Sequence, residues 1–407
     1  MRTLTGFAVE SIRGEFSEGR PQQVKKEEVW FKSSMNRSGV VDLPLHGGTA
    51  PYWLVKRMKS LAYAMFKTIV DEYGVDGAIK KLADPLWFQS LSCALAYDWH
   101  SSGTTTVVCG VLKSVIDPEE FGMGIAGGKG KASRNTLSDI DSIAEKLKLG
   151  DRKIEELKYA SRISAKVDNA CVQDNYQLYH HSMVISEKGE WAVIQQGMNP
   201  RNRYARRYHW LSSSVERYDE EPHQGIVGVL HENVLDMTAK KSRGCRGMSV
   251  DLANTAPGEL ERLYKSLGGG RRRIIEKGQK TLFNFDNVLS SDAAAKVEDE
   301  RSRELVYRLP RRVNWDALRV AYDTQPENYE QFLYIRGVGP ATVRALALVS
   351  ELIYGEPASW RDPVKFSFAF GGKDGVPYPV DRRTMDETTE ILSNVVKEAR
   401  TKMKNIY

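Results

Sequence analysis

Two short segments of the chain place a carboxylate close to a histidine, a combination that suits metal binding or general base catalysis. The first segment holds Asp42 and His46 among glycines, and the second holds Asp98 and His100 between a predicted helix and a predicted strand. A carboxylate that accepts from an imidazole N–H orients the ring for either task. Oxygen and imidazole ligands from both segments could hold magnesium, manganese or zinc if the fold brings them together. Turn and capping roles explain the same residues without chemistry.

A glycine-rich segment, residues 122–135, ends in the cations Lys129 and Lys131 before a predicted helix at 136–148. Backbone N–H groups of such a loop can cradle a phosphate beside a helix N-terminus. The spacing differs from that of a P-loop, so nucleotide hydrolysis is not supported. The pattern fits either a flexible surface loop or a clamp on a nucleic-acid backbone.

A cluster of arginines interleaved with tyrosines follows a predicted β-hairpin, residues 177–185 and 191–196. Such a mixture suits phosphate neutralisation together with base stacking, although a solvated charged face explains it as well. His180 and His181 are neighbours on a strand and face opposite sides, which argues against one metal site for both. The candidate DNA-binding residues here are Gln195, Gln196, Arg201, Arg203, Arg206 and Arg207.

Residues 332–346 are typical of two helices joined by a very short glycine turn. Glycine permits positive φ and close approach of another backbone, and Pro340 suits the first position of the second helix. The free N–H groups at that helix end form a natural phosphate site. An ordinary turn within a helical bundle is the alternative. The residues expected at a DNA backbone are Gly337, Val338, Gly339, Thr342 and Arg344.

Composition sets the broad class of the protein. The chain has 407 residues, of which 41% are apolar and 28% charged, as in soluble globular proteins, and its net charge is +6. The four cysteines lie far apart without a Cys-x-x-Cys pair, which argues against a structural zinc ribbon and for a reducing compartment. No apolar run of about 18 residues occurs. We therefore expect a cytoplasmic protein without membrane contact.

The pattern of expected helices and strands indicates an α+β fold. It has a mixed α/β domain and a C-terminal all-helical domain, which together must position these residues. Helical periodicity marks residues 51–72, 75–96 and 152–171, whereas β-branched residues at 104–115 indicate a strand. Further helices are expected at 315–324, 327–335, 341–354 and 385–402. The predicted boundaries are 1–35 for an extension, 36–255 for the mixed domain, 256–303 for a charged linker and 304–407 for the helical domain.

From residue 38 onward the chain resembles an uncharacterised family of archaeal and bacterial proteins, domain of unknown function 763. The residues that carry this resemblance lie at 41–48, 98–103, 127–131, 191–198 and in the glycine turn. The resemblance implies little about mechanism.

The C-terminal part also resembles the helix-hairpin-helix motif and the base-excision DNA glycosylases that contain it. By that resemblance Asp381, which follows Val380 after a glycine-rich loop, matches the catalytic aspartate. N-capping of the last helix is the alternative role. Bifunctional members carry a Schiff-base lysine where this chain has Ala341, so a lyase step would use Lys129 or Lys131. The spacing to Asp381 is longer than usual, and the four-cysteine cluster of some members is missing.

These observations predict a DNA-repair enzyme that binds double-stranded DNA and acts on damaged bases or abasic sites without a cofactor. The second hypothesis is a metal-dependent nuclease that uses Asp42, His46, Asp98 and His100. Only this hypothesis requires a divalent metal. A DNA-binding scaffold without activity is the third, and an enzyme of nucleotides or small molecules is the weakest.

Overall fold

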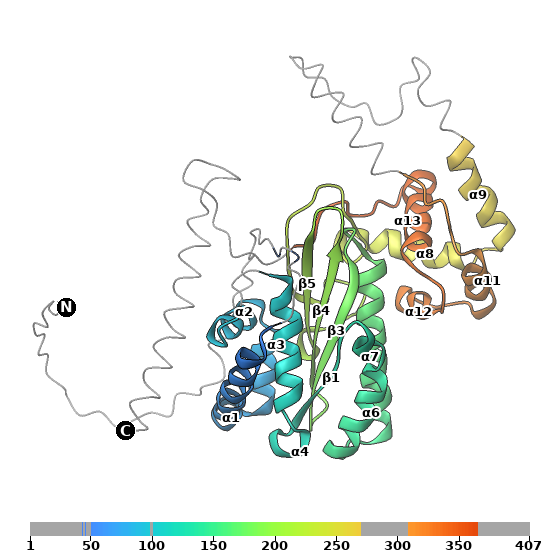
Figure 1. Ribbon diagram of the computed structural model, residues 1–407. Coiled ribbons are helices and arrows are strands. Elements are labelled where there is room, and N and C mark those ends of the chain that lie inside the picture. Colours follow the sequence, from blue (N-terminus) through green and yellow to red (C-terminus); the bar gives the residue numbers. More distant parts are fainter. Residues whose placement is uncertain (1–42, 44, 46–49, 98–100, 270–307, 365–407) are drawn as a thin grey trace, which may run out of the picture. The chain divides into compact units, whose positions relative to one another are not determined.

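The centre of the molecule is a five-stranded antiparallel sheet with the strand order β1-β3-β4-β5-β6 (Figure 1). The computed structural model describes residues 43, 45, 50–97, 101–269 and 308–364. A small second sheet joins β2 to β7. The strands are β1 (Met123–Lys129), β2 (Val172–Gln173), β3 (Gln177–Ser186), β4 (Trp191–Asn199), β5 (Tyr204–Leu211), β6 (His223–Val227) and β7 (Leu235–Asp236).

Helices cover both faces of the large sheet, α1, α2 and α3 on one side and α6 and α7 on the other (Figure 1). Because neither face meets water, most residues of β4 and β5 are buried on both sides instead of alternating. The helices here are α1 (Tyr52–Ala83), α2 (Pro85–Ala94), α3 (Ser102–Val115), α4 (Pro118–Phe121), α5 (Lys131–Arg134), α6 (Thr136–Leu147) and α7 (Asp151–Ala170).

Alternate strand residues supply two apolar cores. Val184 and Ile194 pack with α1 to α3, whereas Met183 and Val193 pack with α6 and α7. The second core continues into the C-terminal helices, since Phe332 belongs to it together with residues of α7 and α8. These helices are α8 (Arg243–Ala253), α9 (Pro257–Gly269), α11 (Trp315–Thr324), α12 (Tyr329–Tyr334) and α13 (Pro340–Tyr354), with 3₁₀ turns at Ser212–Ser214 and Lys240–Ser242.

The described structure is mixed helix and sheet, which confirms the α+β class. The predicted helices at 136–148 and 152–171 and the hairpin formed by β3 and β4 are also confirmed. Part of the expected linker is the helix α9, and residues 308–364 share their core with the sheet. Among the described helices, none is long and apolar enough to cross a membrane.

Two local predictions are wrong for the same physical reason, which is packing against distant parts of the chain. The β-branched run at 104–115 forms α3, whose Val108 and Leu112 are buried against α1 and the sheet. The glycine-rich segment forms β1 and the short helix α5 instead of a loop. A Cβ on Gly124 would lie 2.8 Å from Ile143, and one on Gly127 would lie 2.2 Å from the carbonyl oxygen of His181. These glycines therefore serve close packing.

Candidate nucleic-acid interface

The turn between α12 and α13 is the first candidate contact surface. Gly337 has φ +94°, and a Cβ there would lie 2.7 Å from Nδ2 of Asn314. Gly339 is extended, with φ −140°, and has open space beside it. Only Gly337 therefore adopts the positive φ that glycine permits, and Gly339 instead leaves the approach to the helix end open.

The N-terminus of α13 faces outward without a side-chain cap. Gly339 is the N-cap residue and Pro340 stands in the first turn, so no side chain accepts from the first free N–H groups. Those donors and the helix dipole favour an anion. Val338 and Thr342 are buried, and they support the turn from inside. The prediction that Val338 and Thr342 contact a DNA backbone directly is therefore wrong.

Arg344 is half-buried and acts as a link within the fold. Its Nε donates to the carbonyl oxygen of Arg308 at 3.2 Å, its guanidinium carbon lies 5.0 Å from the ring centre of Trp360, and burial lowers its pKa. At the turn, Asn314 Nδ2 donates to the carbonyl oxygen of Gly337 at 3.1 Å. These two bonds hold residues 308–314 beside α13.

That segment adds positive charge beside the turn and α13. Three of its arginines are exposed, as is one arginine of the turn itself, and in the described part of the chain none of the four forms an ion pair. No sequence motif marks this group, although Arg311 and Arg312 are adjacent, because only the fold brings its members to the turn. We call it the basic strip, formed by Arg308, Arg311, Arg312 and Arg336.

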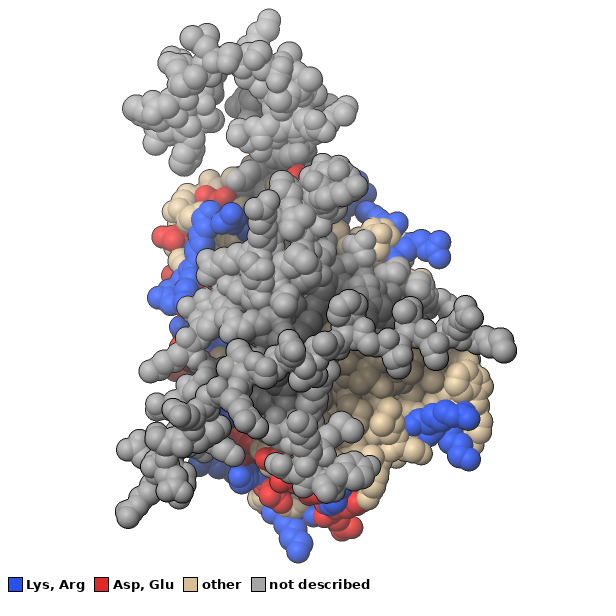
Figure 2. Space-filling view, turned by 90° about the vertical axis from the view of Figure 1, so that its left-hand side faces the viewer, with Lys and Arg blue, Asp and Glu red and all other residues tan. Residues whose placement is uncertain are grey.

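On other parts of the surface, positive and negative side chains are mixed. On the face shown in Figure 2, lysine and arginine side chains of the described residues stand beside aspartate and glutamate side chains along the lower edge. Neighbouring charges of opposite sign largely cancel each other's field, and salt screens what is left over about 10 Å. That edge therefore lacks the uniform charge that the basic strip has.

The predicted arginine cluster divides between the surface and the core. Arg201 and Arg203 are exposed at the turn between β4 and β5, whereas Arg206 is fully buried. Its guanidinium lies 2.9 Å from Oδ2 of Asp174 and 2.7 Å from Oδ2 of Asp362. Because two buried carboxylates hold the Arg206 side chain, it is not available to DNA phosphates. Its predicted DNA contact is therefore wrong.

Arg207 points to the opposite face of the sheet and is buried too. It donates to Nε2 of His209 at 2.8 Å and to Oε1 of Gln89 at 3.2 Å. The described residues provide it with no carboxylate, and burial lowers its pKa to about 10. Gln196 is buried beside it, with its Nε2 donating to the carbonyl oxygen of Ser102 at 2.8 Å. The predicted DNA contacts of Arg207 and Gln196 are therefore wrong, because both side chains stabilise the layer between the sheet and the helices.

Gln195 belongs to a buried relay on the α7 face. Ser161 Oγ lies 2.9 Å from Nε2 of His181, whose Nδ1 lies 3.0 Å from Oε1 of Gln195, and Gln195 Nε2 donates to Asp168 at 2.5 Å. The order of groups is that of a nucleophile, its base and an orienting residue. All four residues are buried, so the relay holds α7 on the sheet, and the predicted DNA contact of Gln195 is corrected.

The predicted catalytic groups fall at different places. Lys129 and Lys131 are exposed at the end of β1 and the start of α5, and the sheet register places Lys129 opposite His180. His180 is buried, which lowers its pKa to about 3, and its Nδ1 has no partner. Five predicted site residues lie outside the described residues: Asp42, His46, Asp98, His100 and Asp381.

Metal and thiol chemistry find no site in the part of the chain that is described. No group of three or more histidine, cysteine or acidic residues there could hold a metal ion. The four cysteines are unpaired. Burial raises the pKa of Cys109 and of Cys245 to about 12, which keeps both thiols protonated and poorly nucleophilic.

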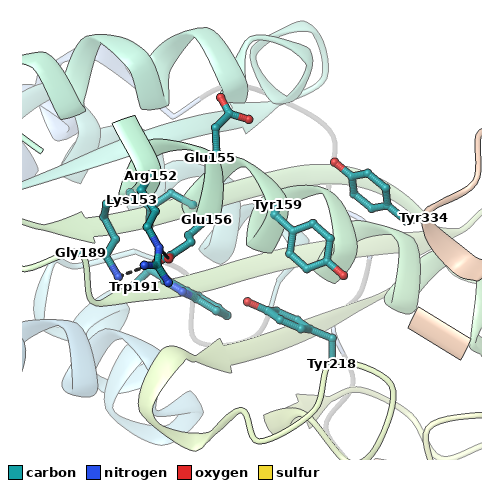
Figure 3. Close-up of a pocket in the computed structure, with 10 residues that line it drawn as sticks. Arg152, Lys153, Glu155, Glu156, Tyr159, Gly189, Trp191, Tyr218 and Tyr334 are labelled. Atoms are coloured by element: carbon teal, nitrogen blue, oxygen red, sulfur yellow. Dashed lines mark hydrogen bonds and ion pairs between the residues drawn. The ribbon is translucent and has the colours of Figure 1, made fainter. Parts of the chain in front are cut away.

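A cavity of about 690 Å³ lies between α7, β4 and Tyr334, the last residue of α12 (Figure 3). Cationic and acidic side chains of α7 line one part of it, and the rest is aromatic apart from Leu157 and Gly189. Ring centroids are separated by 6.2 Å between Trp191 and Tyr218, 5.7 Å between Tyr218 and Tyr159, and 5.0 Å between Tyr159 and Tyr334. We call these four residues the aromatic row.

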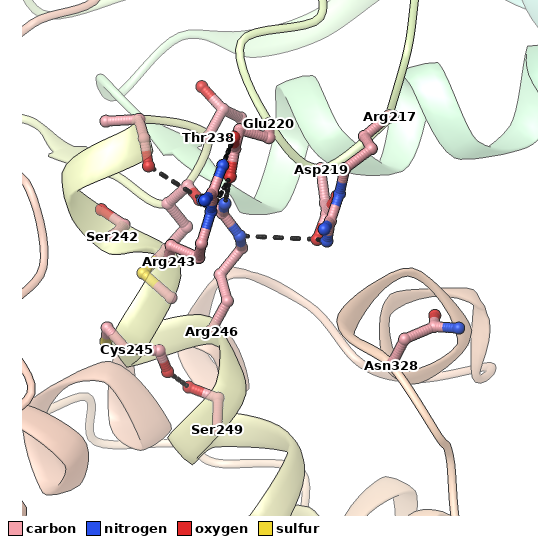
Figure 4. Close-up of polar contacts among 12 residues, drawn as sticks. Arg217, Asp219, Glu220, Thr238, Ser242, Arg243, Cys245, Arg246, Ser249 and Asn328 are labelled. Atoms are coloured by element: carbon pink, nitrogen blue, oxygen red, sulfur yellow. Dashed lines mark hydrogen bonds and ion pairs between the residues drawn. The ribbon is translucent and has the colours of Figure 1, made fainter.

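The aromatic row is assembled from elements that are distant in sequence. Ion pairs fix the loop that carries one of its rings, Tyr218. Tyr218 stands in a loop whose next residues, Asp219 and Glu220, pair with Arg246 of α8 (Figure 4). The Asp219 Oδ2 lies 3.4 Å from Nε of Arg246, and Arg246 also donates to the carbonyl oxygen of Met237 at 2.7 Å. Buried arginine thus fixes the loop on α8.

Comparison with known proteins yields one match. A family model described as a protein of unknown function, DUF763, matches residues 39–380. No curated protein and no solved structure matches the chain.

Proposed function

The chain belongs to the DUF763 family, whose function is unknown, and from its own residues we propose that it binds double-stranded DNA at the α12–α13 turn. The uncapped N-terminus of α13, open beside Gly339, is the observation that carries this proposal. It supplies free N–H donors and the positive end of a helix dipole to one phosphate.

The basic strip supports the same proposal. Arg308, Arg311, Arg312 and Arg336 are exposed around the turn, and the described residues neutralise none of them. Arginine and backbone N–H contacts with phosphates position a protein on a duplex without reading its bases. We therefore expect binding that depends strongly on salt and little on sequence.

Chemistry on damaged bases or abasic sites is the second half of the proposal. It rests on the resemblance of residues 371–381 to the base-excision glycosylases, which assigns the catalytic carboxylate to Asp381. Lys129 and Lys131 are exposed and thus accessible for a Schiff-base step. The nuclease and the non-enzymatic scaffold remain the rival functions.

The binding test is Gly339→Asp. Aspartate is a favoured N-cap residue, and Gly339 has room for a side chain and an ordinary φ, so the fold is retained. The carboxylate would occupy the phosphate position and repel the ligand. We expect affinity for a labelled 20-base-pair duplex, measured by fluorescence anisotropy, to fall at least about tenfold, a loss of about 1.4 kcal/mol.

Gly150→Asp is the matched control. Gly150 is the N-cap residue of α7, also without a side-chain cap and with open space, so the same charge change occurs at another helix end. We expect its duplex affinity to equal that of the wild type within about twofold. Wild-type affinity in a folded Gly339→Asp protein would remove the turn from the proposal.

The activity test uses end-labelled duplexes that carry uracil, an oxidised base or an abasic site, with and without EDTA. Breaks that need alkali but no metal indicate base release, and loss of them in Asp381→Asn assigns that carboxylate. Breaks that EDTA abolishes favour the nuclease. Binding without any break favours the scaffold.

A further inference from the structure

The rings of the aromatic row pack on one another, with Trp191 only 7% exposed and Tyr334 the most exposed of the four, and the cavity that they line carries little net charge. Of the side chains in the cavity lining, Arg152 and Lys153 are balanced by Glu155 and Glu156. Glu156 pairs with both cations, at 3.0 Å and 2.8 Å, so these carboxylate and cationic groups offset each other. Such a lining disfavours a ligand of either charge and favours a flat, uncharged ring stacked on tyrosine or tryptophan.

The cavity has the volume of a ligand site. Its volume of about 690 Å³ lies within the range of about 300–1,000 Å³ that is typical of such sites. Tyr334 has 40% of its surface exposed, and the Tyr218 hydroxyl has no hydrogen-bond partner in the described structure. A ring that enters the cavity thus meets both an aromatic face and a free hydroxyl.

Charge for phosphates is found at the end of the row that adjoins the turn. Arg162 is exposed, and its Nη1 donates to the Tyr334 hydroxyl at 2.9 Å. Tyr334 precedes Gly337 by three residues, which span at most about 11 Å. One strand held at the turn therefore reaches the row within about three nucleotides, since stacked nucleotides rise about 3.4 Å each.

We propose that the aromatic row stacks the bases of an unpaired strand, which makes DNA with a duplex-to-single-strand junction the preferred substrate class. This inference rests on the proposed duplex binding at the turn, which would place the junction beside Tyr334. Stacking on aromatic side chains accepts any base, so the preference concerns DNA structure and not sequence.

Three kinds of probe test the preference by anisotropy at one salt concentration. They are a blunt 20-base-pair duplex, the same duplex with a six-nucleotide thymidine overhang, tried at the 3′ end and at the 5′ end, and the same overhangs made of abasic nucleotides. Abasic overhangs keep the phosphates but have nothing to stack. We expect the thymidine overhang of one polarity to bind at least about tenfold more tightly than either other probe.

Variants assign the preference to the row. Tyr334→Leu is expected to abolish the overhang preference while blunt-duplex affinity stays unchanged, and Tyr334→Trp is expected to retain it. Tyr354→Leu is the matched control, since Tyr354 is an exposed tyrosine at the other end of α13. Tyr218→Leu tests the centre of the row independently.

The outcomes separate this inference from the proposed function. Equal binding of the blunt and thymidine-overhang probes overturns the stacking role. So does equal binding of abasic and thymidine overhangs, or an overhang preference that persists in both Tyr334→Leu and Tyr218→Leu. If Gly339→Asp still lowers blunt-duplex affinity, the turn keeps its function in that case. Failure of wild-type protein to bind any of the probes overturns both.

Discussion

At the scale of residues, burial decides the role of a charge more than its type does. Arg206 and Arg207 are neighbours in a cluster that resembles a DNA-binding patch, yet strand alternation sends them to opposite faces of a covered sheet. One meets two carboxylates and the other meets only neutral acceptors. Arg308 and Arg312, which lie in no conspicuous motif, are exposed beside the turn.

Arg206→Leu is expected to be strongly destabilising. It would leave Asp174 and Asp362 buried without their cation, at a cost of about 3–5 kcal/mol in the free energy of unfolding. Arg201→Ala, in the same cluster but exposed, should change it by no more than about 0.5 kcal/mol. Urea unfolding followed by circular dichroism measures both. Similar stability for the two variants contradicts the structural role of Arg206.

At the scale of elements, caps and turns cooperate at the candidate interface. The Asn314 side chain accepts from the backbone N–H of Ala317 at 3.1 Å, which caps α11, and donates to the carbonyl oxygen of Gly337. Asn328 caps α12 by accepting from Gln331 N–H at 2.9 Å. The two asparagines thus share a capping role, and Asn314 alone contacts Gly337.

Asn314→Ala and Asn328→Ala separate these roles. Each loses a cap and should lower the free energy of unfolding by about 1 kcal/mol. Only Asn314→Ala releases Gly337, so it alone should weaken binding of the blunt duplex, by several-fold in anisotropy titrations. Equal DNA affinities for the two variants would show that the Asn314 bond does not position the turn.

At the scale of the whole molecule, the C-terminal helices depend on the sheet layer. Phe332, Leu333 and Val343 share a core with Leu157 and Ile163 of α7. Burial of such side chains contributes about 1.5–3 kcal/mol each, and helices cut away from α7 would expose them. The aromatic row also exists only where α7, β4, the Tyr218 loop and α12 meet.

A fragment of residues 304–407 is therefore expected not to fold alone. Circular dichroism and thermal melting should show little helix and no cooperative transition, because the apolar partners from α7 and α8 are missing. The full-length chain is the control and should melt cooperatively. A cooperative melt of the fragment would instead support the predicted independent helical domain.

Local pattern determined those parts of the protein in which neighbours in sequence are neighbours in space. The sequence predicted the helices α6 and α7, alternation predicted the β3–β4 hairpin, and glycines before Pro340 predicted the α12–α13 turn. A helix or tight turn is largely decided by contacts over a few residues, so the sequence carries enough information there.

Tertiary structure decided whatever depends on long-range burial. A β-branched segment became α3, glycines became the strand β1, and two arginines became core residues, since packing outweighs propensities worth at most about 1 kcal/mol per residue. The basic strip and the aromatic row combine residues that are far apart in the chain. No local pattern contains such a combination, because it arises only when distant segments pack together.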